Sequence, residues 1–176
     1  MSLDKHLVHD RTCGECTVCC ISLRIEEPEL TKKTDVPCPN LSSMKGCAIY
    51  ESRPGVCRNW FCGWRIMPFL NEEMRPDKSK VLIKTDGVNF IFQPLTSQDV
   101  SSLLNKSVME ALGTLVINDI SVQTSIPTRP GFTNAMFPVN EILKPSFEKM
   151  DLREGRQAMK KIIFRSRHAQ TLPEKD

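Results

Sequence analysis

Apolar and polar residues follow a regular pattern only in the second half of the chain. The stretch KVLIKTDGVNFIFQP places two runs rich in β-branched and aromatic residues on either side of Asp86-Gly87. An Asp-Gly pair tolerates the positive φ angles of a type I′ turn, which is the turn that most often joins two antiparallel strands. The pattern therefore predicts a β-hairpin centred on this dipeptide.

The next stretch, SQDVSSLLNKSVMEALGTL, has helical spacing. Ser97 is the expected N-cap, and the apolar residues recur three or four positions apart, which places them on one face. That face comprises Val100, Leu103, Leu104, Val108, Ala111 and Leu112.

Three further elements and a loop are predicted beyond this helix. TLVINDISVQT predicts a third strand, and TSIPTRPGFTNAMFPV, which contains Pro and Gly, predicts a loop. NEILKPSFEKM and REGRQAMKKIIFRSR predict helices, and Pro145 is expected to break or delay the first of them.

The first half of the chain lacks such periodicity. Prolines and glycines interrupt it every few residues, so it cannot build a large apolar core by itself, and small regions of this kind usually need a covalent or metal staple. The interrupting residues are Pro28, Pro37, Pro39, Pro54, Gly14, Gly46, Gly55 and Gly63.

Composition and charge restrict the class of protein. Of the 176 residues, 40% are hydrophobic and 26% charged, an ordinary globular balance. The net charge is only +3, which argues against a nucleic-acid partner. We expect no membrane span and, because the N-terminus lacks an apolar stretch, no signal peptide. These expectations place the chain in a reducing cytoplasm, where disulfides rarely persist.

Cysteine usage divides the chain in two. All eight cysteines precede residue 63, at Cys13, Cys16, Cys19, Cys20, Cys38, Cys47, Cys57 and Cys62. In a reducing compartment this crowding favours a metal or cluster site over disulfides. We therefore expect a metal-binding region over 1–75 and an α+β region of unknown role over 76–176.

The spacing of the first cysteines is typical of metal ligands. Thiolates are soft donors that suit zinc and iron–sulfur clusters, and two consecutive C-x2-C steps occur in bacterial ferredoxins. Cysteine pairs such as Cys57 and Cys62 also suit a tetrahedral zinc site. Eight thiols suffice for two tetrathiolate centres, or for one cluster with spare ligands. Adjacent Cys19 and Cys20 should point apart, and they could serve two centres or leave one thiol buried nearby.

These motifs resemble the YkgJ-type cysteine-cluster family, which is described as zinc- or iron-chelating. The family pattern has C-x2-C-x2-C-C, a C-x-x-L element and then C-x-[IV]-Y-x-x-R-P-x-x-C-R. The resemblance spans roughly 13–62 and implies metal chelation. Related domains occur in flagellin lysine methylases, but no Gly-rich nucleotide loop supports that activity in this chain. The matching residues are Cys13, Cys16, Cys19, Cys20, Cys38, Leu41, Cys47, Ile49, Tyr50, Arg53, Pro54, Cys57 and Arg58.

A thiolate-bound centre carries negative charge, and several residues near the cysteines in the sequence could offset that charge or shield the centre from water. Arg53, Arg58 and Lys45 could donate N–H bonds to sulfur, and Tyr50 could help to exclude water. Aromatic residues with the same shielding role are Trp60, Phe61 and Trp64. Weaker candidate ligands are His9 and the acidic run Glu26, Glu27 and Glu29.

The sequence thus predicts an α+β protein whose irregular, metal-stapled N-terminal region packs on a small α+β region with a hairpin. The predicted ligand is an iron–sulfur cluster, favoured by the ferredoxin-like spacing, or Zn²⁺. Three functions remain open: electron transfer or assistance to an enzyme, a structural zinc module that binds a protein partner, and metal delivery or sensing.

Overall fold

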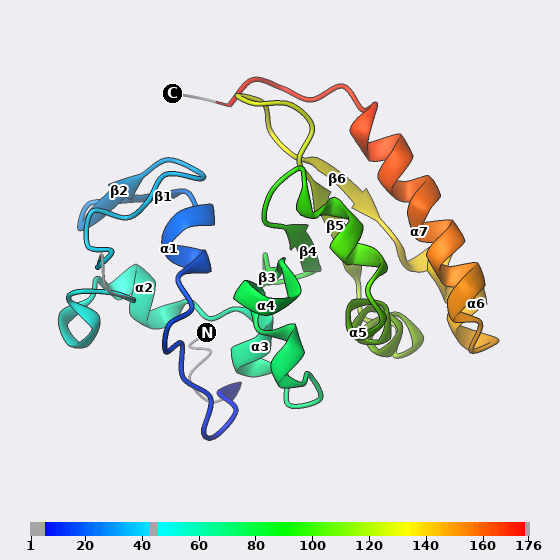
Figure 1. Cartoon of the computed structure of the whole chain (residues 1–176), viewed down its shortest axis with the longest axis horizontal. Helices are drawn as coiled ribbons and strands as arrows, with labels where there is room; N and C mark the ends of the chain where they lie inside the picture. Colours follow the sequence, from blue (N-terminus) through cyan, green and yellow to red (C-terminus); the bar gives the residue numbers. More distant parts are fainter. Residues whose placement is uncertain (1–5, 43–45, 175–176) are drawn as a thin grey trace. The chain divides into compact units, whose positions relative to one another are not determined.

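A computed structural model describes residues 6–42 and 46–174 and confirms the α+β class (Figure 1). The chain forms two compact units, Met1–Lys78 and Ser79–Asp176, which we call the amino-terminal and the carboxy-terminal unit. The predicted boundary lay three residues earlier, at 75. None of the helices within the described residues is both long and apolar enough to cross a membrane.

The amino-terminal unit is built from short elements joined by loops. Its only sheet within the described residues is the antiparallel hairpin of β1 and β2, which the sequence analysis missed, and its tip is Pro28-Glu29. The elements are α1 (Val18–Ser22), β1 (Ile25–Glu27), β2 (Leu30–Lys32), η2 (Tyr50–Ser52), α2 (Gly55–Asn59), α3 (Gly63–Ile66), η3 (Glu72–Met74) and α4 (Pro76–Ser79), where η marks a 3-10 helix.

Apolar burial is sparse in the part of this unit that carries most of the cysteines. Among the described residues from 19 to 60, Leu30 is the only apolar side chain that is buried. The remaining buried apolar residues of the unit are Val18, Phe61, Trp64, Met67, Leu70 and Met74. Residues 19–60 therefore gain little from the hydrophobic effect, which is the dominant stabilising term in most folds.

The carboxy-terminal unit has a four-stranded sheet in the order β3-β4-β5-β6, in which β4 and β5 are parallel and the other pairs antiparallel. Helices α5, α6 and α7 contact one another, and α5 and α7 also contact the sheet (Figure 1). The elements are β3 (Val81–Thr85), β4 (Phe90–Pro94), η4 (Asp99–Leu104), α5 (Lys106–Ile117), β5 (Val122–Ile126), β6 (Ala135–Pro138), α6 (Asn140–Glu148) and α7 (Leu152–Arg167).

The predicted hairpin is present, but its turn is not type I′. The strands pair from Val81 with Pro94 to Thr85 with Phe90, which leaves four residues in the loop. Gly87 has a φ of 93°, whereas Asp86 does not have the positive φ that type I′ requires. The Asp86 carboxylate instead accepts hydrogen bonds from the Val88 and Asn89 amides, at 2.9 and 2.7 Å.

The predicted helix over 97–115 is in fact two helices. Asn105 has an extended backbone and separates η4 from α5. The N-cap of η4 is Gln98 rather than Ser97, and its side chain makes no capping hydrogen bond. Just before it, Thr96 Oγ1 accepts from the amides of Gln98 and Asp99 at 3.2 and 3.3 Å. The predicted apolar face is buried except for Leu104, which is half-buried.

Three other expectations for this unit were wrong. The third strand begins at Val122, because α5 continues to Ile117 through the start of the expected strand. The expected loop contains a fourth strand, β6. Pro145 lies inside α6 without breaking it, so only the hydrogen bond that its missing N–H would have made is lost.

Candidate metal centres

All eight cysteines are free thiols, and each is half-buried. A cysteine that serves only as a small apolar residue is usually fully buried. Half-buried thiols can reach both solvent and one another, which is what exchangeable or ligating sulfurs need. The burial of these residues therefore argues against a role in packing alone.

Four of the thiols, Cys13, Cys16, Cys19 and Cys62, form what we call the first thiol group. A turn joins the first two, with the Cys16 amide donating to the Cys13 carbonyl at 2.9 Å. Burial raises the pKa of Cys62 to about 11, and the nearby sulfurs of Cys13 and Cys16 add to the increase. The pKa of Cys19 is raised by its hydrogen bond with Cys20 first, then by burial, and also by the charges of Cys20, Cys13 and Cys62.

Backbone amides point at two sulfurs of the first thiol group. The amides of Val18 and Asp77 donate to Cys16, and those of Arg65 and Trp64 donate to Cys62. Burial still raises the pKa of Cys16, but these donors favour the thiolate form. Hydrogen bonds from amides to sulfur are a usual means of stabilising metal-bound thiolates.

The other four cysteines, Cys20, Cys38, Cys47 and Cys57, form the second thiol group. The Cys38 amide donates to the Cys20 carbonyl at 2.8 Å, and the Leu41 amide donates to the Cys38 carbonyl at 2.9 Å. Leu41 also forms an isolated antiparallel bridge with Cys47. Burial raises the pKa of Cys57, and the charges of Cys20, Cys38 and Cys47 raise it further.

Cys19 and Cys20 belong to different groups yet remain in contact. Their side chains share a hydrogen bond, which lowers the pKa of Cys20 and raises that of Cys19. The two thiols, which were expected to point apart, are therefore still within hydrogen-bond reach of each other. The contact places the two groups next to each other at α1.

Each thiol group has one buried cation beside it, and the sequence analysis missed both. Arg65 is 9% exposed, and its Nη1 donates to Cys13 Sγ at 3.4 Å. Lys32 is 5% exposed, and its Nζ donates to the carbonyls of Ile21, Leu23 and Lys33. Burial lowers the pKa of Lys32, whereas the charges of Cys38, Asp35, Cys20 and Cys19 oppose that shift.

The sequence carries only weak signals for these two cations. Lys32 shares a strand face with the buried Leu30, where the alternating pattern would predict an apolar residue. Arg65 stands three residues after Cys62, at the spacing of a first helical turn. Neither position falls within the family-like motif.

Two nitrogen atoms near the first thiol group are left without partners. Within the described part of the chain, the buried Nε of Arg65 and the buried Nε1 of Trp64 find no hydrogen-bond acceptor. Buried donors are rarely left unpaired, because this costs free energy. A thiolate sulfur is one kind of atom that could accept from such donors.

The residues that were predicted to offset or shield the charge of a metal centre differ in their contacts and in their exposure to solvent. Arg53 lies 3.9 Å from the Tyr50 ring centroid and donates to the Tyr50 and Cys57 carbonyls at 3.0 and 3.4 Å. Its charge opposes the rise in the pKa of Cys57, so it lies near the second thiol group. Arg58 is exposed, Tyr50 is 38% exposed, and Lys45 lies outside the described residues.

The aromatic residues that were predicted to shield the centre also differ in burial. Phe61 and Trp64 are buried, whereas Trp60 is half-buried. The Arg65 guanidinium lies 5.5 Å from the Phe61 ring centroid, so this ring covers the cation that contacts Cys13. Phe61 therefore packs against the cation that contacts Cys13.

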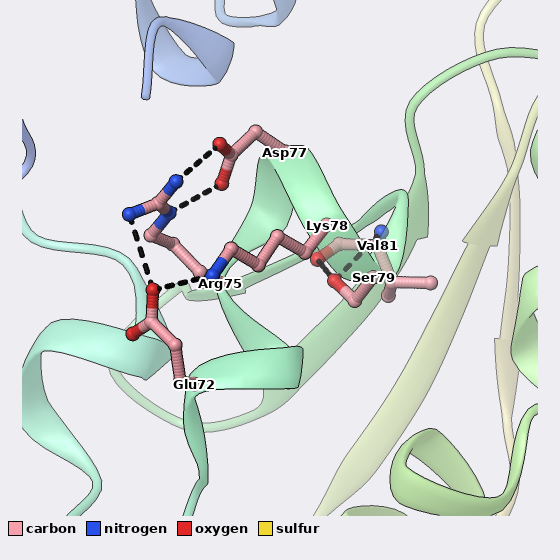
Figure 2. Close-up of polar contacts among 6 residues, drawn as sticks. All are labelled: Glu72, Arg75, Asp77, Lys78, Ser79 and Val81. Atoms are coloured by element: carbon pink, nitrogen blue, oxygen red, sulfur yellow. Dashed lines mark hydrogen bonds and ion pairs between the residues drawn. The ribbon is translucent and has the colours of Figure 1, made fainter. Parts of the chain in front are cut away.

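A chain of ion pairs reaches the first thiol group from α4. Arg75 forms two bonds with the Asp77 carboxylate, at 2.7 and 2.8 Å, and an ion pair with Glu72 at 3.1 Å (Figure 2). Lys78 also pairs with Glu72, at 2.9 Å. The Asp77 carboxylate accepts from the Cys16 thiol, so this network holds the segment that carries the amide donor to Cys16.

The weaker candidate ligands do not join either group. His9 is exposed and pairs with Asp10 at 2.8 Å. Glu26 and Glu27 are exposed on β1, and Glu26 pairs with Arg24. Glu29 instead accepts a hydrogen bond from the Gly55 amide at 2.8 Å, which caps the start of α2 and ties the hairpin to it.

The sulfurs are near one another without forming a closed coordination site. Among the described residues, no three His, Cys, Asp or Glu side chains are arranged so that they could hold a metal ion as they stand. The electrostatic and backbone contacts place the sulfurs of a group near one another, but not close enough together to coordinate one ion. Binding an ion would therefore require the sulfurs of a group to move closer together.

Comparisons with known proteins identify no relative. The chain matches no family model, and neither the curated proteins nor the solved structures include a match. The functional argument therefore depends on the site itself.

Proposed function

We propose that this protein binds a soft metal through the cysteines of its amino-terminal unit. The observation that carries the proposal is the gathering of half-buried free thiols between residues 13 and 62, with buried cations beside them. Among the described residues of this segment, the only buried apolar side chains are those of Val18, Leu30 and Phe61. Packed neutral thiols would not need buried cations. Thiolates bound to a metal would, because their negative charge must be offset.

An iron–sulfur cluster is the ligand that the spacing favours. The first thiol group combines C-x2-C-x2-C with a distant fourth cysteine, which resembles the ligand pattern of ferredoxins. When bound, such a cluster would supply one-electron chemistry. The role of this chain would be to hold the cluster, to limit its contact with water through Phe61 and to offset its charge through Arg65. The protein would transfer electrons or assist an enzyme in the cytoplasm.

Structural zinc is the second candidate, and the scarcity of buried apolar side chains in residues 19–60 favours it. Closed tetrathiolate zinc sites contribute directly to folding free energy and have no redox chemistry. In this case the metal would stabilise a module that binds a protein partner. Metal delivery or sensing would instead require that the half-buried thiols exchange the ion with an acceptor.

The test is an anaerobic preparation analysed at once for iron, zinc and acid-labile sulfide. Stoichiometric iron with sulfide and a brown colour would support the cluster, whereas a colourless protein with stoichiometric zinc would support the structural ion. Transfer of the metal to an apo-acceptor would support delivery. A fully reduced, metal-free protein that is still ordered over residues 10–65 would contradict metal binding altogether.

A substitution provides the matched experiment. Cys16→Ser should increase hydrogen exchange over residues 10–65 more than in the hairpin of β3 and β4, because the metal is expected to order only the amino-terminal unit. If each region is as well protected from hydrogen exchange in the variant as in the parent, the result would count against a metal that orders the amino-terminal unit.

A further inference from the structure

Positive charge is concentrated on α7, the last helix of the carboxy-terminal unit. This helix has six cationic side chains and one carboxylate, so its net charge is +5. Because the whole chain has a net charge of only +3, all other residues together carry −2. The low net charge of the chain therefore conceals a strongly basic helix, and such a concentration is typical of elements that bind polyanions.

Helix geometry places most of this charge on one side of α7. Consecutive residues of an α-helix differ in direction by about 100°, so positions 153, 157, 160, 161 and 164 lie within about 100° of one another. The opposite side packs on the rest of the unit, where α7 contacts α5, α6, β5, β6 and η4 (Figure 1). We call the solvent-facing side the basic face. Its exposed residues are Arg153, Gln157, Lys160, Lys161, Phe164, Arg165 and His168.

The fold uses two other arginines of α7 but leaves the basic face unpaired. Arg156 Nε donates to the Leu104 carbonyl at 2.9 Å, and Arg167 Nη2 donates to the Ser97 carbonyl at 3.1 Å. The only carboxylate of α7, that of Glu154, pairs with a lysine outside the helix. Within the described part of the chain, four side chains of the basic face have neither an ion pair nor a hydrogen bond: Arg153, Lys160, Lys161 and Arg165.

Unpaired cations on one helix face do not help the fold. Lys161 and Arg165 are four residues apart, and like charges at this spacing repel each other across one helical turn. The helix dipole stabilises cations only in the last turn, so it does not account for Arg153 or Lys160. The basic face is therefore better suited to binding an anionic partner than to stabilising α7.

An aromatic pair lies within the basic face. Phe164 is 65% exposed, and its ring centroid lies 4.4 Å from that of His168. Nδ1 of His168 donates to the Phe164 carbonyl at 2.8 Å, which holds the imidazole ring against the phenyl ring. Insertion of this pair among lipid acyl chains would remove water from the imidazole, which is unfavourable. An unpaired nucleic-acid base can instead stack on the exposed ring while its phosphates lie beside the cations.

We propose that the basic face of α7 binds single-stranded RNA. Phosphates attract lysine and arginine whatever the base sequence, and aromatic side chains stack bases whose faces are free. Bases in a duplex are already stacked on one another, whereas RNA presents unpaired bases in loops, bulges and ends. The proposal does not depend on metal binding, because it uses none of the cysteines and concerns the carboxy-terminal unit alone.

The test of the charge measures binding of a labelled single-stranded RNA of about 15 nucleotides to the full chain, by fluorescence anisotropy at several salt concentrations. Four phosphate contacts predict that the logarithm of the association constant falls with the logarithm of the salt concentration with a slope of about −3. Lys160→Gln/Lys161→Gln should reduce the size of this slope by about 1.4. The matched control, Arg58→Gln/Lys106→Gln, removes two exposed cations elsewhere and should leave the slope unchanged. Equal effects of the two double variants would overturn the assignment to α7.

The test of the aromatic pair compares the same RNA with an abasic strand of equal length. The unsubstituted chain should bind the abasic strand about 5- to 150-fold more weakly, which corresponds to the loss of one stacked base. Phe164→Leu should bind the two strands equally well and keep the salt slope. Equal binding of both strands by the unsubstituted chain would overturn the proposal, and this comparison requires no variant to fold.

A membrane surface is the competing partner for a basic helix with an exposed phenylalanine. Vesicles of phosphatidylserine and phosphatidylcholine are the probe for it, with the same Lys160→Gln/Lys161→Gln variant. Binding to these vesicles that is lost in the variant, together with no binding of the RNA, would overturn the proposal and assign the basic face to an anionic membrane. Metal content should be the same in all of these variants and in the parent, so failure of this proposal is distinct from failure of the proposed metal binding.

Discussion

Nη1 of Arg65 lies 3.4 Å from Sγ of Cys13, while the amide of the same arginine donates to the Cys62 carbonyl at 2.9 Å. Arg65 is therefore a single buried residue that contacts two cysteines from distant parts of the sequence. Its backbone amide favours the thiolate form of Cys62.

Arg65→Met should weaken metal binding at the first thiol group. The change puts an unbranched apolar side chain in the buried position and removes the cation and the donor to Cys13. Loss of such a hydrogen bond typically lowers metal affinity by about 10- to 100-fold. Competition with a chelator would measure the change. Arg58→Met is the matched control, because Arg58 is exposed. A larger effect from the control than from Arg65→Met would show that the motif arginine, and not Arg65, offsets the charge.

Lys32→Met should destabilise the amino-terminal unit and weaken binding at the second thiol group. The carbonyls of Ile21, Leu23 and Lys33 would lose a charged donor, and a hydrogen bond to a charged group contributes about 1.5–3 kcal/mol. Denaturant unfolding of the metal-loaded protein would measure the stability effect, and competition with a chelator would measure the effect on metal binding. Lys160→Met removes an equal charge from an exposed site and should change neither. An unaltered free energy of unfolding in Lys32→Met would contradict the structural role of Lys32.

Glu29→Ala should loosen the start of α2, the helix that carries Cys57. The Gly55 amide would lose its carboxylate acceptor, and loss of a helix cap costs about 1 kcal/mol. Hydrogen exchange over residues 55–59 should increase. Glu27→Ala alters an exposed side chain on the same hairpin and should leave exchange in α2 unchanged. Similar exchange in the two variants would show that the cap does not hold α2.

The stability of the carboxy-terminal unit should depend on Asp86 at acid pH. Hydrogen bonds from the Asn89 amide and side chain and from the Val88 amide lower the pKa of Asp86 to about 2. Because the pKa is lower in the folded state, the stabilisation is complete above the ordinary carboxyl range. It is lost as the pH falls from about 4 to about 2.

Asp86→Asn should flatten that part of the pH profile, since amide side chains do not titrate in this range. Urea unfolding at several pH values between these limits would measure it, and Asp119→Asn, at another exposed aspartate, provides a comparison. An unchanged acid slope in Asp86→Asn would mean that other carboxylates dominate the transition.

Gly113→Ala should destabilise the carboxy-terminal unit without changing metal content. A Cβ at this position of α5 would lie 3.0 Å from Cδ1 of Phe147 in α6, and overpacking of this kind costs about 1–3 kcal/mol. Thermal unfolding and elemental analysis would report the two properties. Adding Phe147→Leu should relieve the clash, so the double variant should lose less stability than the sum of the single changes. Simple additivity would show that the contact does not limit packing.

The sequence predicted local features well where the deciding forces act between neighbouring residues. The hairpin strands and the apolar face of η4 and α5 follow from short-range spacing. The type of the hairpin turn was wrong because the Asp86 side chain binds two amides of its own loop, which replaces the type I′ geometry. The strand β6 was missed because its four residues carry little signal and its formation depends on pairing with β5.

By itself, the sequence determined that every thiol lies in the first 62 residues and that this region lacks the spacing of a large apolar core. The division of the thiols into two groups was decided by tertiary structure, as were the placement of Arg65 beside Cys13 and of Lys32 beside the second thiol group. The physical reason is that ligand grouping and charge compensation depend on contacts between residues that are distant in the sequence, such as Arg65 and Cys13. Backbone hydrogen bonds and burial create those contacts, and the spacing of cysteines along the chain does not record them.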